Sequence, residues 1–247
     1  MTAEHIPALK LLWQEAFGDP APVIDAFFAT GFSPDRCNCL LQDGKPVSAL
    51  HWFDCQLGSK KLAYIYAVAT LKSHRGKGLG RKLLENTHHL LRTKGYTGCL
   101  LVPGSEELFG CYETFGYRTA TAISEFSCRA GRHPIPAREI PAREYTRLRQ
   151  TLLPAGGVIQ KDSALDFLQT QGHFYTGDGW LLAGSAENSI LTVQEFLGDP
   201  QIAPAILRAL NCREGRFRAP GADRPFSMLL PLSADCPAPA YFGLALD

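Results

Sequence analysis

The sequence predicts a mixed α+β fold made of two lobes. Runs of apolar residues with the period of a strand alternate along the chain with runs of helical period. A loop rich in glycine, at residues 74–81, joins an apolar strand to a helix. The order of elements then recurs after residue 143, and 247 residues with 45% hydrophobic composition can bury two modest cores.

Two helices are expected within residues 1–31. Apolar residues recur at helical spacing from Ile6 to Phe17, and Gly18-Asp19-Pro20 breaks that run before a second helix over Val23 to Phe28. A hairpin about Asp43-Gly44 follows, because this dipeptide favours a two-residue turn between antiparallel strands. The strands expected beside and after this turn are Cys39 to Gln42, Pro46 to Phe53 and Leu62 to Ala69.

The first lobe continues with a helix from Leu79 to Thr93. This helix is expected to end at Lys94-Gly95, a basic last turn with a glycine cap. Ser105 is followed by two acids and is expected to cap a short helix, since carboxylates favour the positive end of a helix. The expected strands are Gly98 to Val102 and Tyr117 to Cys128, and the leucines expected on one side of the long helix are Leu79, Leu83, Leu84, Leu90 and Leu91.

The second lobe begins after a segment rich in proline and arginine, Arg129 to Arg143, which is expected to be a linker or surface arm. At the place of the glycine loop it has Gly198-Asp199-Pro200, where an acid and a proline without an N–H exclude a second phosphate site. The lobe is either a degenerate repeat of the first or an unrelated α+β extension. The expected elements are helices at Glu144 to Leu153, at Ala164 to Gln171 and ending at Leu210, and strands at Trp180 to Gly184, Ile190 to Phe196, Gly215 to Arg218 and Phe226 to Leu230.

The glycine loop has the composition of a polyphosphate site. Glycine accepts positive φ, so alternating glycines let successive backbone N–H groups turn toward one point and let a ligand approach the main chain. The helix that follows adds unpaired amides and a partial positive charge at its N-terminus. The glycines are Gly76, Gly78 and Gly80, and the basic residues beside them are Arg75, Lys77, Arg81 and Lys82.

Two common phosphate loops do not fit these residues. A Walker loop places Lys and then Ser or Thr after its last glycine, whereas Leu79 follows Gly78. A dinucleotide-binding loop needs a small residue at the position of Leu83 and an acid about 20 residues later, where Gly98 stands. The spacing that remains, Arg-x-x-Gly-x-Gly, is filled by Arg75, Gly78 and Gly80.

This spacing, directly after Val68-Ala69-Thr70, resembles the GNAT superfamily of acetyl-CoA dependent N-acetyltransferases. A second, independent match lies downstream, where residues 112–117, Tyr-Glu-Thr-Phe-Gly-Tyr, are similar to the family's Tyr-Glu-x-x-Gly-Phe/Tyr segment. The resemblance covers residues 1–129. It implies a GNAT fold, a central mixed β-sheet with two splayed parallel strands and flanking helices. A second GNAT-like or α+β lobe at residues 130–247 would then shape the acceptor side.

The resemblance also implies site residues. Acetyl-CoA, as co-substrate, would lie where the strands Leu62 to Thr70 and Cys99 to Val102 splay apart, and a bulge in the first strand would free backbone groups for the acetyl carbonyl and the pantetheine amides. Tyr112 is implied as the general acid, and Ser105 stands where the family often has an asparagine near the pantetheine arm. The residues implied to bind the cofactor are Val68, Ala69, Thr70, Arg75, Gly76, Lys77, Gly78, Leu79, Gly80, Arg81 and Ser105.

The implied reaction is direct transfer of the acetyl group. A neutral amine attacks the thioester carbonyl, a backbone N–H near Val68 stabilises the oxyanion, and Tyr112 returns a proton to sulfur. Cys111 is not expected to form a thioester, because no base is evident beside it. Some family members have a glutamate on the strand that here carries Tyr64 and Tyr66. The alternatives for the base are a water chain, His51, Asp54, Glu106, Glu107 or the C-terminal carboxylate of Asp247.

Composition argues against several other classes of function. With 25 basic and 24 acidic residues there is no basic stripe for nucleic acid. Eight scattered cysteines without a Cys-x-x-Cys pair predict reduced thiols, and His74, His88 and His89 lack partners for a metal site, so no metal is expected. Apolar runs shorter than 18 residues and an N-terminus unlike a signal peptide predict a cytoplasmic protein without a membrane partner. We expect a monomer or a homodimer.

Two functions remain open at this point. The first is an acyltransferase that acetylates the primary amine of a small molecule or peptide. The second is a non-catalytic sensor or regulatory module that binds acetyl-CoA or a longer acyl-CoA. The missing strand carboxylate favours the second function, whereas Arg75, Gly78, Gly80 and Tyr112 favour the first.

Overall fold

The computed structural model describes residues 3–161 and 163–246, and the chain divides into two compact units. Unit 1 contains residues 1–101, 105–118 and 229–237, and unit 2 contains residues 102–104, 119–228 and 238–247. The boundary expected after residue 129 divides the chain once, whereas these units interleave along it. Unit 1 therefore includes a short segment that follows most of unit 2 in the sequence.

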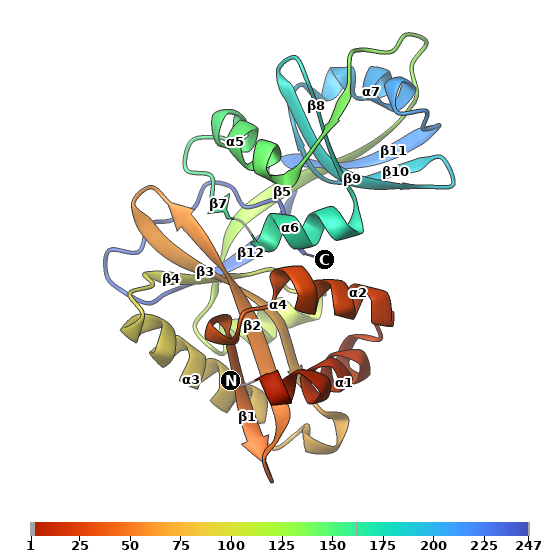
Figure 1. The fold of residues 1–247 in the computed structure, drawn as a ribbon. Coiled ribbons are helices and arrows are strands. Elements are labelled where there is room, and N and C mark those ends of the chain that lie inside the picture. The colour runs from red at the N-terminus through yellow and green to blue at the C-terminus, as the bar shows by residue number, and fades with distance from the viewer. Residues whose placement is uncertain (1–2, 162, 247) are drawn as a thin grey trace. The chain divides into compact units, whose positions relative to one another are not determined.

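Unit 1 is a sheet with helices on both faces. Strands β1, β2 and β3 are consecutive antiparallel neighbours, and β4 pairs with β3 in parallel. Helices α1 and α2 lie on one face of β1 to β3 and α3 lies on the other, as Figure 1 shows. The elements are α1 (Ile6–Phe17), α2 (Ala21–Ala26), the π-helical turn η2 (Phe27–Gly31), β1 (Cys37–Gln42), β2 (Lys45–Leu57), β3 (Lys60–Thr70), α3 (Leu79–Thr93), β4 (Gly98–Leu101) and α4 (Glu106–Glu113), with 3-10 turns η1 (Ala3–His5), η3 (Pro34–Arg36) and η4 (Lys72–His74).

Local sequence explains several boundaries in unit 1. Asp43 and Gly44 both have positive φ, 50° and 74°, which confirms the predicted two-residue turn between β1 and β2. Gly18 ends α1 in the left-handed conformation. Helix α3 has the predicted bounds, but its buried side differs from the predicted one. Leu79 and Leu90 are only half-buried, and the buried residues are Leu83, Leu84, Thr87, His88 and Leu91.

Unit 2 is built on a second group of strands. The sheet order runs β12, β5, β11, β10, β9, β8 and β6, where β5 begins and β12 ends with residues of unit 1. Helix α7 covers one face through a core of Leu182, Leu191 and Phe217. The elements are β5 (Arg118–Arg129), β6 (Arg138–Ile140), α5 (Ala142–Leu152), β7 (Ile159–Gln160), α6 (Ser163–Gln171), β8 (His173–Gly177), β9 (Trp180–Glu187), β10 (Ile190–Leu197), η5 (Pro200–Ile202), α7 (Ala203–Ala209), β11 (Glu214–Pro220) and β12 (Arg224–Pro231).

The order of elements in unit 1 recurs in unit 2. Two helices precede three antiparallel strands in each, α1 and α2 before β1 to β3 and α5 and α6 before β8 to β10. One helix then leads to a strand that pairs in parallel with the third, β4 with β3 and β11 with β10. The third strand also carries a register shift in both units. This shared order supports the degenerate repeat over an unrelated extension.

The second half differs from the predicted elements in three places. The segment 129–143, expected to be a linker, contains β6, which pairs with β8. Strand β8 was not predicted at all. The apolar segment 242–246 forms no strand but is largely buried, and its neighbour Tyr241 forms one isolated bridge with Gly157.

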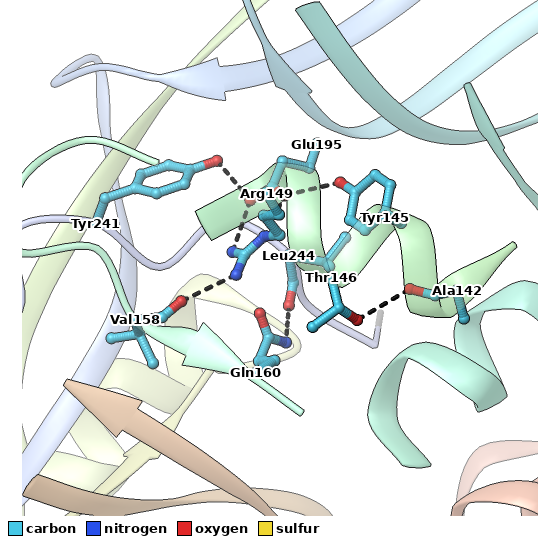
Figure 2. Close-up of polar contacts among 9 residues, drawn as sticks. All are labelled: Ala142, Tyr145, Thr146, Arg149, Val158, Gln160, Glu195, Tyr241 and Leu244. Carbon is cyan, nitrogen blue, oxygen red and sulfur yellow. Dashed lines mark hydrogen bonds and ion pairs between the residues drawn. The ribbon is translucent and has the colours of Figure 1, made fainter. Parts of the chain in front are cut away.

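Unit 2 also contains a buried ion pair that the sequence did not predict. Arg149 of α5 donates two hydrogen bonds to Glu195 of β10, with distances of 2.6 and 2.9 Å, and a third to the Val158 carbonyl at 3.0 Å (Figure 2). The hydroxyls of Tyr145 and Tyr241 donate to the same carboxylate at 2.8 and 3.1 Å. Arg149 is 2% exposed and Glu195 fully buried, so the pair is compensated by hydrogen bonds as a buried charge requires.

Candidate active site

The last third of β3 is bulged and leaves its parallel neighbour. Tyr66 lies opposite His51 and Ala69 opposite Ala49, so two residues of β3, 67 and 68, face the single residue between those partners. Ala67 has a positive φ of 52°, which is uncommon outside glycine. The parallel pairing of β3 with β4 runs from residue 62 to residue 64 of β3, and β3 continues to residue 70. The implied bulge and the implied splay are both present in unit 1.

A buried hydroxyl fixes the end of this strand. Ser48 of β2, which is fully buried, lies 2.8 Å from the Thr70 hydroxyl and donates to the Ala69 carbonyl at 3.0 Å. Sequence reasoning missed Ser48, because nothing in its local pattern distinguishes a buried serine from an exposed one. It positions two of the residues implied to bind the cofactor.

The glycine loop has the backbone conformation that a phosphate site requires. Gly76 and Gly78 have φ of 74° and 73°, and a Cβ at either position would meet no atom within 4 Å, so backbone conformation alone selects glycine there. Gly78 is the N-cap of α3 and no side chain caps this end, which leaves the first amides of the helix without intrahelical partners. Gly80 has no positive φ, so flexibility is not the reason for glycine at that position.

The basic side chains beside the loop mainly hold the loop itself. Arg75 Nε donates to the Thr70 carbonyl at 3.1 Å, and Lys77 Nζ donates to the Ser73 carbonyl at 3.0 Å. Arg81 reaches the tyrosine segment, with its guanidinium 4.6 Å from the Phe115 ring centroid. Arg75 and Lys77 are therefore engaged with backbone carbonyls of the loop and of the strand before it.

Tyr112 lies in α4 and keeps its proton. Its ring is half-buried, 5.7 Å from the ring of Tyr117, and burial, assisted by the neighbouring Cys111, raises its pKa to about 12. Ser105 is at the N-cap position of the same helix, but its side chain makes no capping hydrogen bond, contrary to the expected cap. Helix α4 has no fully buried residue.

Two of the candidate bases are unsuited to that role. His51 is 4% exposed among aromatic rings, and burial lowers its pKa to about 3. Asp54 accepts a hydrogen bond from Tyr96 and pairs with Arg36 at 3.4 Å and Lys61 at 3.6 Å. The other candidates are Glu106 and Glu107, which are exposed in the first turn of α4, and Asp247, which lies outside the described residues.

Two of the histidines make polar contacts with other side chains. His88 is buried on α3 and its Nε2 lies 2.9 Å from the Tyr117 hydroxyl. His74 Nε2 lies 2.9 Å from Gln42 Oε1, beside the loop. Over the described ranges no group of three His, Cys, Asp or Glu side chains is arranged to hold a metal ion. In the same residues no helix combines the length and the apolar character needed to cross a bilayer.

Comparisons with known proteins agree with this geometry. The chain has the fold of a GCN5-related N-acetyltransferase from Kribbella flavida, with 18% identity over 95% of this chain and 71% of the other and a TM-score of 0.70. A GCN5-related N-acetyltransferase from Anabaena variabilis is 14% identical over 94% of this chain and 71% of its own, with a TM-score of 0.75. Eis1 from Mycobacterium abscessus is 13% identical over 95% of this chain and 73% of its own, with a TM-score of 0.68. No curated protein sequence matches the chain.

Membership of a protein family is shown by a match at the level of sequence. The family model described as an acetyltransferase (GNAT) domain matches residues 1–120, which contain the bulged strand, the glycine loop and Tyr112. Acetyl-CoA is the co-substrate that such a domain implies. Residues 1–120 therefore form an acetyltransferase domain of the GNAT family.

Proposed function

We propose that this protein is an N-acetyltransferase that moves the acetyl group of acetyl-CoA to a primary amine of a small molecule or peptide by direct attack. The observation that carries the proposal is the β3 bulge at residues 67 and 68, which stands directly before the glycine loop. A bulge leaves backbone groups outside the sheet ladder, and here they lie one short turn from the phosphate-binding amides.

The proposed chemistry assigns one task to each part of the site. The amides of the glycine loop and of the α3 N-terminus bind the diphosphate of acetyl-CoA. The backbone N–H near Val68 stabilises the oxyanion that forms when the neutral amine attacks the thioester carbonyl. The carbon–sulfur bond then breaks, and Tyr112 donates its proton to the leaving thiolate. Burial raises the pKa of Tyr112 to about 12, so the phenol holds the proton that this step requires at neutral pH.

A second function, an acyl-CoA binding module without turnover, is favoured by one observation. The two candidate bases on β2 are a histidine whose pKa burial lowers to about 3 and an aspartate held by two cations. An enzyme of this kind needs another route for the amine proton, such as a chain of waters. The amine then enters already neutral or loses its proton to solvent.

The test separates binding from turnover. Calorimetry measures the affinity of the full chain for acetyl-CoA, and release of free thiol is then followed with polyamines, aminoglycosides, amino acids and peptides as acceptors. We expect binding together with acceptor-dependent thiol release for at least one amine class. Binding without turnover on any amine rejects the enzyme in favour of the binding module, and absence of binding rejects both.

A further inference from the structure

The turn η4, which joins β3 to the glycine loop, is held by residues of two other elements. Glu15 of α1 accepts a hydrogen bond from the Lys72 amide at 2.5 Å, although the two residues are 57 positions apart in the sequence. Gln42, the last residue of β1, has its Oε1 2.9 Å from His74 Nε2. All four residues belong to unit 1, and the acetyl-transfer proposal assigns no task to Glu15 or Gln42.

Glu15 satisfies an amide that the turn itself leaves unpaired. Lys72 is the first residue of η4, and the first N–H groups of a helical turn have no partner within it. A carboxylate accepts a charge-assisted hydrogen bond, which is stronger than a neutral one. Helix α1 is a fixed support for this carboxylate, because its residues Leu12 and Trp13 are only 3% and 2% exposed. The position of Lys72 is therefore tied to the core of unit 1.

Gln42 holds the other end of the turn through His74. An amide oxygen can only accept, so Nε2 of the neutral ring donates to Gln42, and Nδ1 is left to accept from the Ser73 hydroxyl at 2.8 Å. The Ser73 carbonyl accepts in turn from Lys77 Nζ at 3.0 Å. Because Lys77 belongs to the glycine loop, a chain of hydrogen bonds leads from the end of β1 into that loop.

Apolar packing ends where the turn begins. Leu71, directly before η4, contacts the apolar core beneath α1 and is half-buried, whereas the first two residues of η4 are exposed. A groove of about 850 Å³ is lined by residues of α1, of the turn between β1 and β2 and of η4, and these include Glu15, Gln42 and His74. Hydrogen bonds of the lining residues therefore connect η4 to α1 and to β1 across this groove.

The charge of Glu15 opposes the binding of an anion by the neighbouring loop. A carboxylate repels a diphosphate, so charge alone predicts that Glu15 lowers the affinity for acetyl-CoA. Its hydrogen bond to Lys72 acts in the opposite direction, because a turn that is already ordered loses less conformational freedom when a ligand binds. A variant that removes the carboxylate distinguishes the two effects, since they change the affinity in opposite directions.

We propose that Glu15 and Gln42 are positioning residues of the acetyl-CoA site, which hold η4 so that the amides of the glycine loop are in place before the cofactor binds. Neither residue is assigned a contact with the cofactor. This inference rests on the proposed binding of the diphosphate by the glycine loop. It adds that α1 and β1 set the affinity of that loop through the backbone of the turn.

The first test is calorimetric titration of the full chain with acetyl-CoA. Glu15→Ala should weaken binding by about fivefold or more, the effect of one hydrogen bond, although it removes a negative charge. Glu15→Gln keeps an acceptor oxygen and should bind at least as tightly as the parent. Glu4→Ala is the matched control, because it removes the same charge from an exposed position outside the groove lining, and it should not weaken binding.

Gln42→Ala tests the second tether. It should also weaken acetyl-CoA binding, whereas Gln14→Ala, which removes the same amide group from α1 within the same groove lining, should leave the affinity unchanged. Glu15, Gln42 and both control positions are exposed, so all of these variants should keep the melting temperature of the parent protein. Equal effects of Gln42→Ala and Gln14→Ala would remove Gln42 from the proposal.

The second test follows the turn in the absence of the cofactor. Hydrogen exchange of the Lys72 amide, measured by NMR, should be faster in Glu15→Ala than in the parent and close to the parent rate in Glu15→Gln. Unchanged exchange in Glu15→Ala overturns this inference alone, as does acetyl-CoA binding by Glu15→Ala that equals or exceeds that of the parent. A parent protein that binds no acetyl-CoA overturns the proposed function and this inference together.

Discussion

The hydroxyl groups of Ser48 and Thr70 lie 2.8 Å apart and join β2 to the last residue of β3. The Thr70 carbonyl accepts a hydrogen bond from Arg75 at 3.1 Å, so one residue is tied to the neighbouring strand and to the glycine loop. A Cβ at Gly80 would lie 3.9 Å from the Thr70 hydroxyl oxygen. The strand end, the loop and the first turn of α3 are thus in contact at Thr70.

Gly78→Ala should remove acetyl-CoA binding with only a modest loss of stability. A side chain at φ 73° costs about 1–2 kcal/mol, and relief of this strain would turn the N-terminal amides of α3. Gly58→Ala is the matched control, because Gly58 has φ 58° and open space around it in the turn between β2 and β3. Calorimetry should show a loss of at least tenfold in affinity for Gly78→Ala alone. Similar affinities for the two variants would contradict a role for the loop conformation.

Gly80→Asp should weaken acetyl-CoA binding while leaving the fold intact. The fold should tolerate this change, because Gly80 has an ordinary φ and an added Cβ would contact Thr70 at a normal distance. A carboxylate in the first turn also stabilises a helix. The same carboxylate repels a diphosphate. Gly80→Ala adds the Cβ without the charge and should bind nearly as the parent does. If both variants bind equally poorly, volume and not charge decides the effect.

Tyr112→Phe should leave acetyl-CoA affinity near normal and lower kcat by about 10²-fold, because a general acid contributes at least that much. The pKa of about 12 means that the parent enzyme should not lose activity through ionisation of this phenol below about pH 11. Calorimetry and a pH profile of kcat with a productive acceptor check both statements. A loss of affinity as large as the loss of kcat would remove Tyr112 from the chemistry.

His51 should make the protein less stable in mild acid. Burial lowers its pKa from 6.5 to about 3, so the unfolded chain binds a proton below pH 6.5 that the folded chain does not bind. The resulting loss in the free energy of unfolding is absent well above pH 6.5, grows as the pH falls and reaches about 2 kcal/mol at pH 5. Urea unfolding at pH 7 and pH 5 should show a smaller loss for His51→Phe than for the parent. The exposed His89→Phe should show the parent's loss, and an identical loss in all three would refute the assignment.

Arg149→Met should lower the free energy of unfolding by about 3–5 kcal/mol, because it leaves the buried Glu195 carboxylate without its cation. The double variant Arg149→Met with Glu195→Leu should recover most of this loss, since a buried ion pair is often replaceable by apolar side chains. Denaturant unfolding of the two single variants and the double variant forms the thermodynamic cycle. A double variant as unstable as the sum of the single ones would show that the two residues act separately.

The parts of the fold that the sequence predicts well are those fixed by neighbouring residues. The turn at Asp43-Gly44 and the bounds of α3 depend on glycine conformation, helical period and a basic last turn, all of which are visible in short windows. The short strands β6 and β8 were missed because pairing with each other and with β9 decides them, and pairing is a property of distant residues.

The candidate site shows the same contrast between local and distant signals. The glycine loop and the tyrosine segment are local motifs that can be read from the sequence, and the bulge in β3 was predicted from the family resemblance. Ser48 and the pairing of Arg149 with Glu195 had no local signal, since burial and partner are set by tertiary packing. The burial of His88 on the core side of α3, with its Nε2 2.9 Å from the Tyr117 hydroxyl, had no local signal either.

The interleaving of the two units has a consequence for how the protein is made. Unit 1 takes residues 229–237 from near the end of the chain, where Asp235 pairs with Lys60 and the Leu232 carbonyl accepts from Arg92 at 3.3 Å. A nascent chain on the ribosome cannot complete this unit until residues 229–237 have emerged, so co-translational folding of unit 1 must wait for those late contacts. A fragment cut after residue 129 would expose the surface that those residues cover and become a substrate for chaperones.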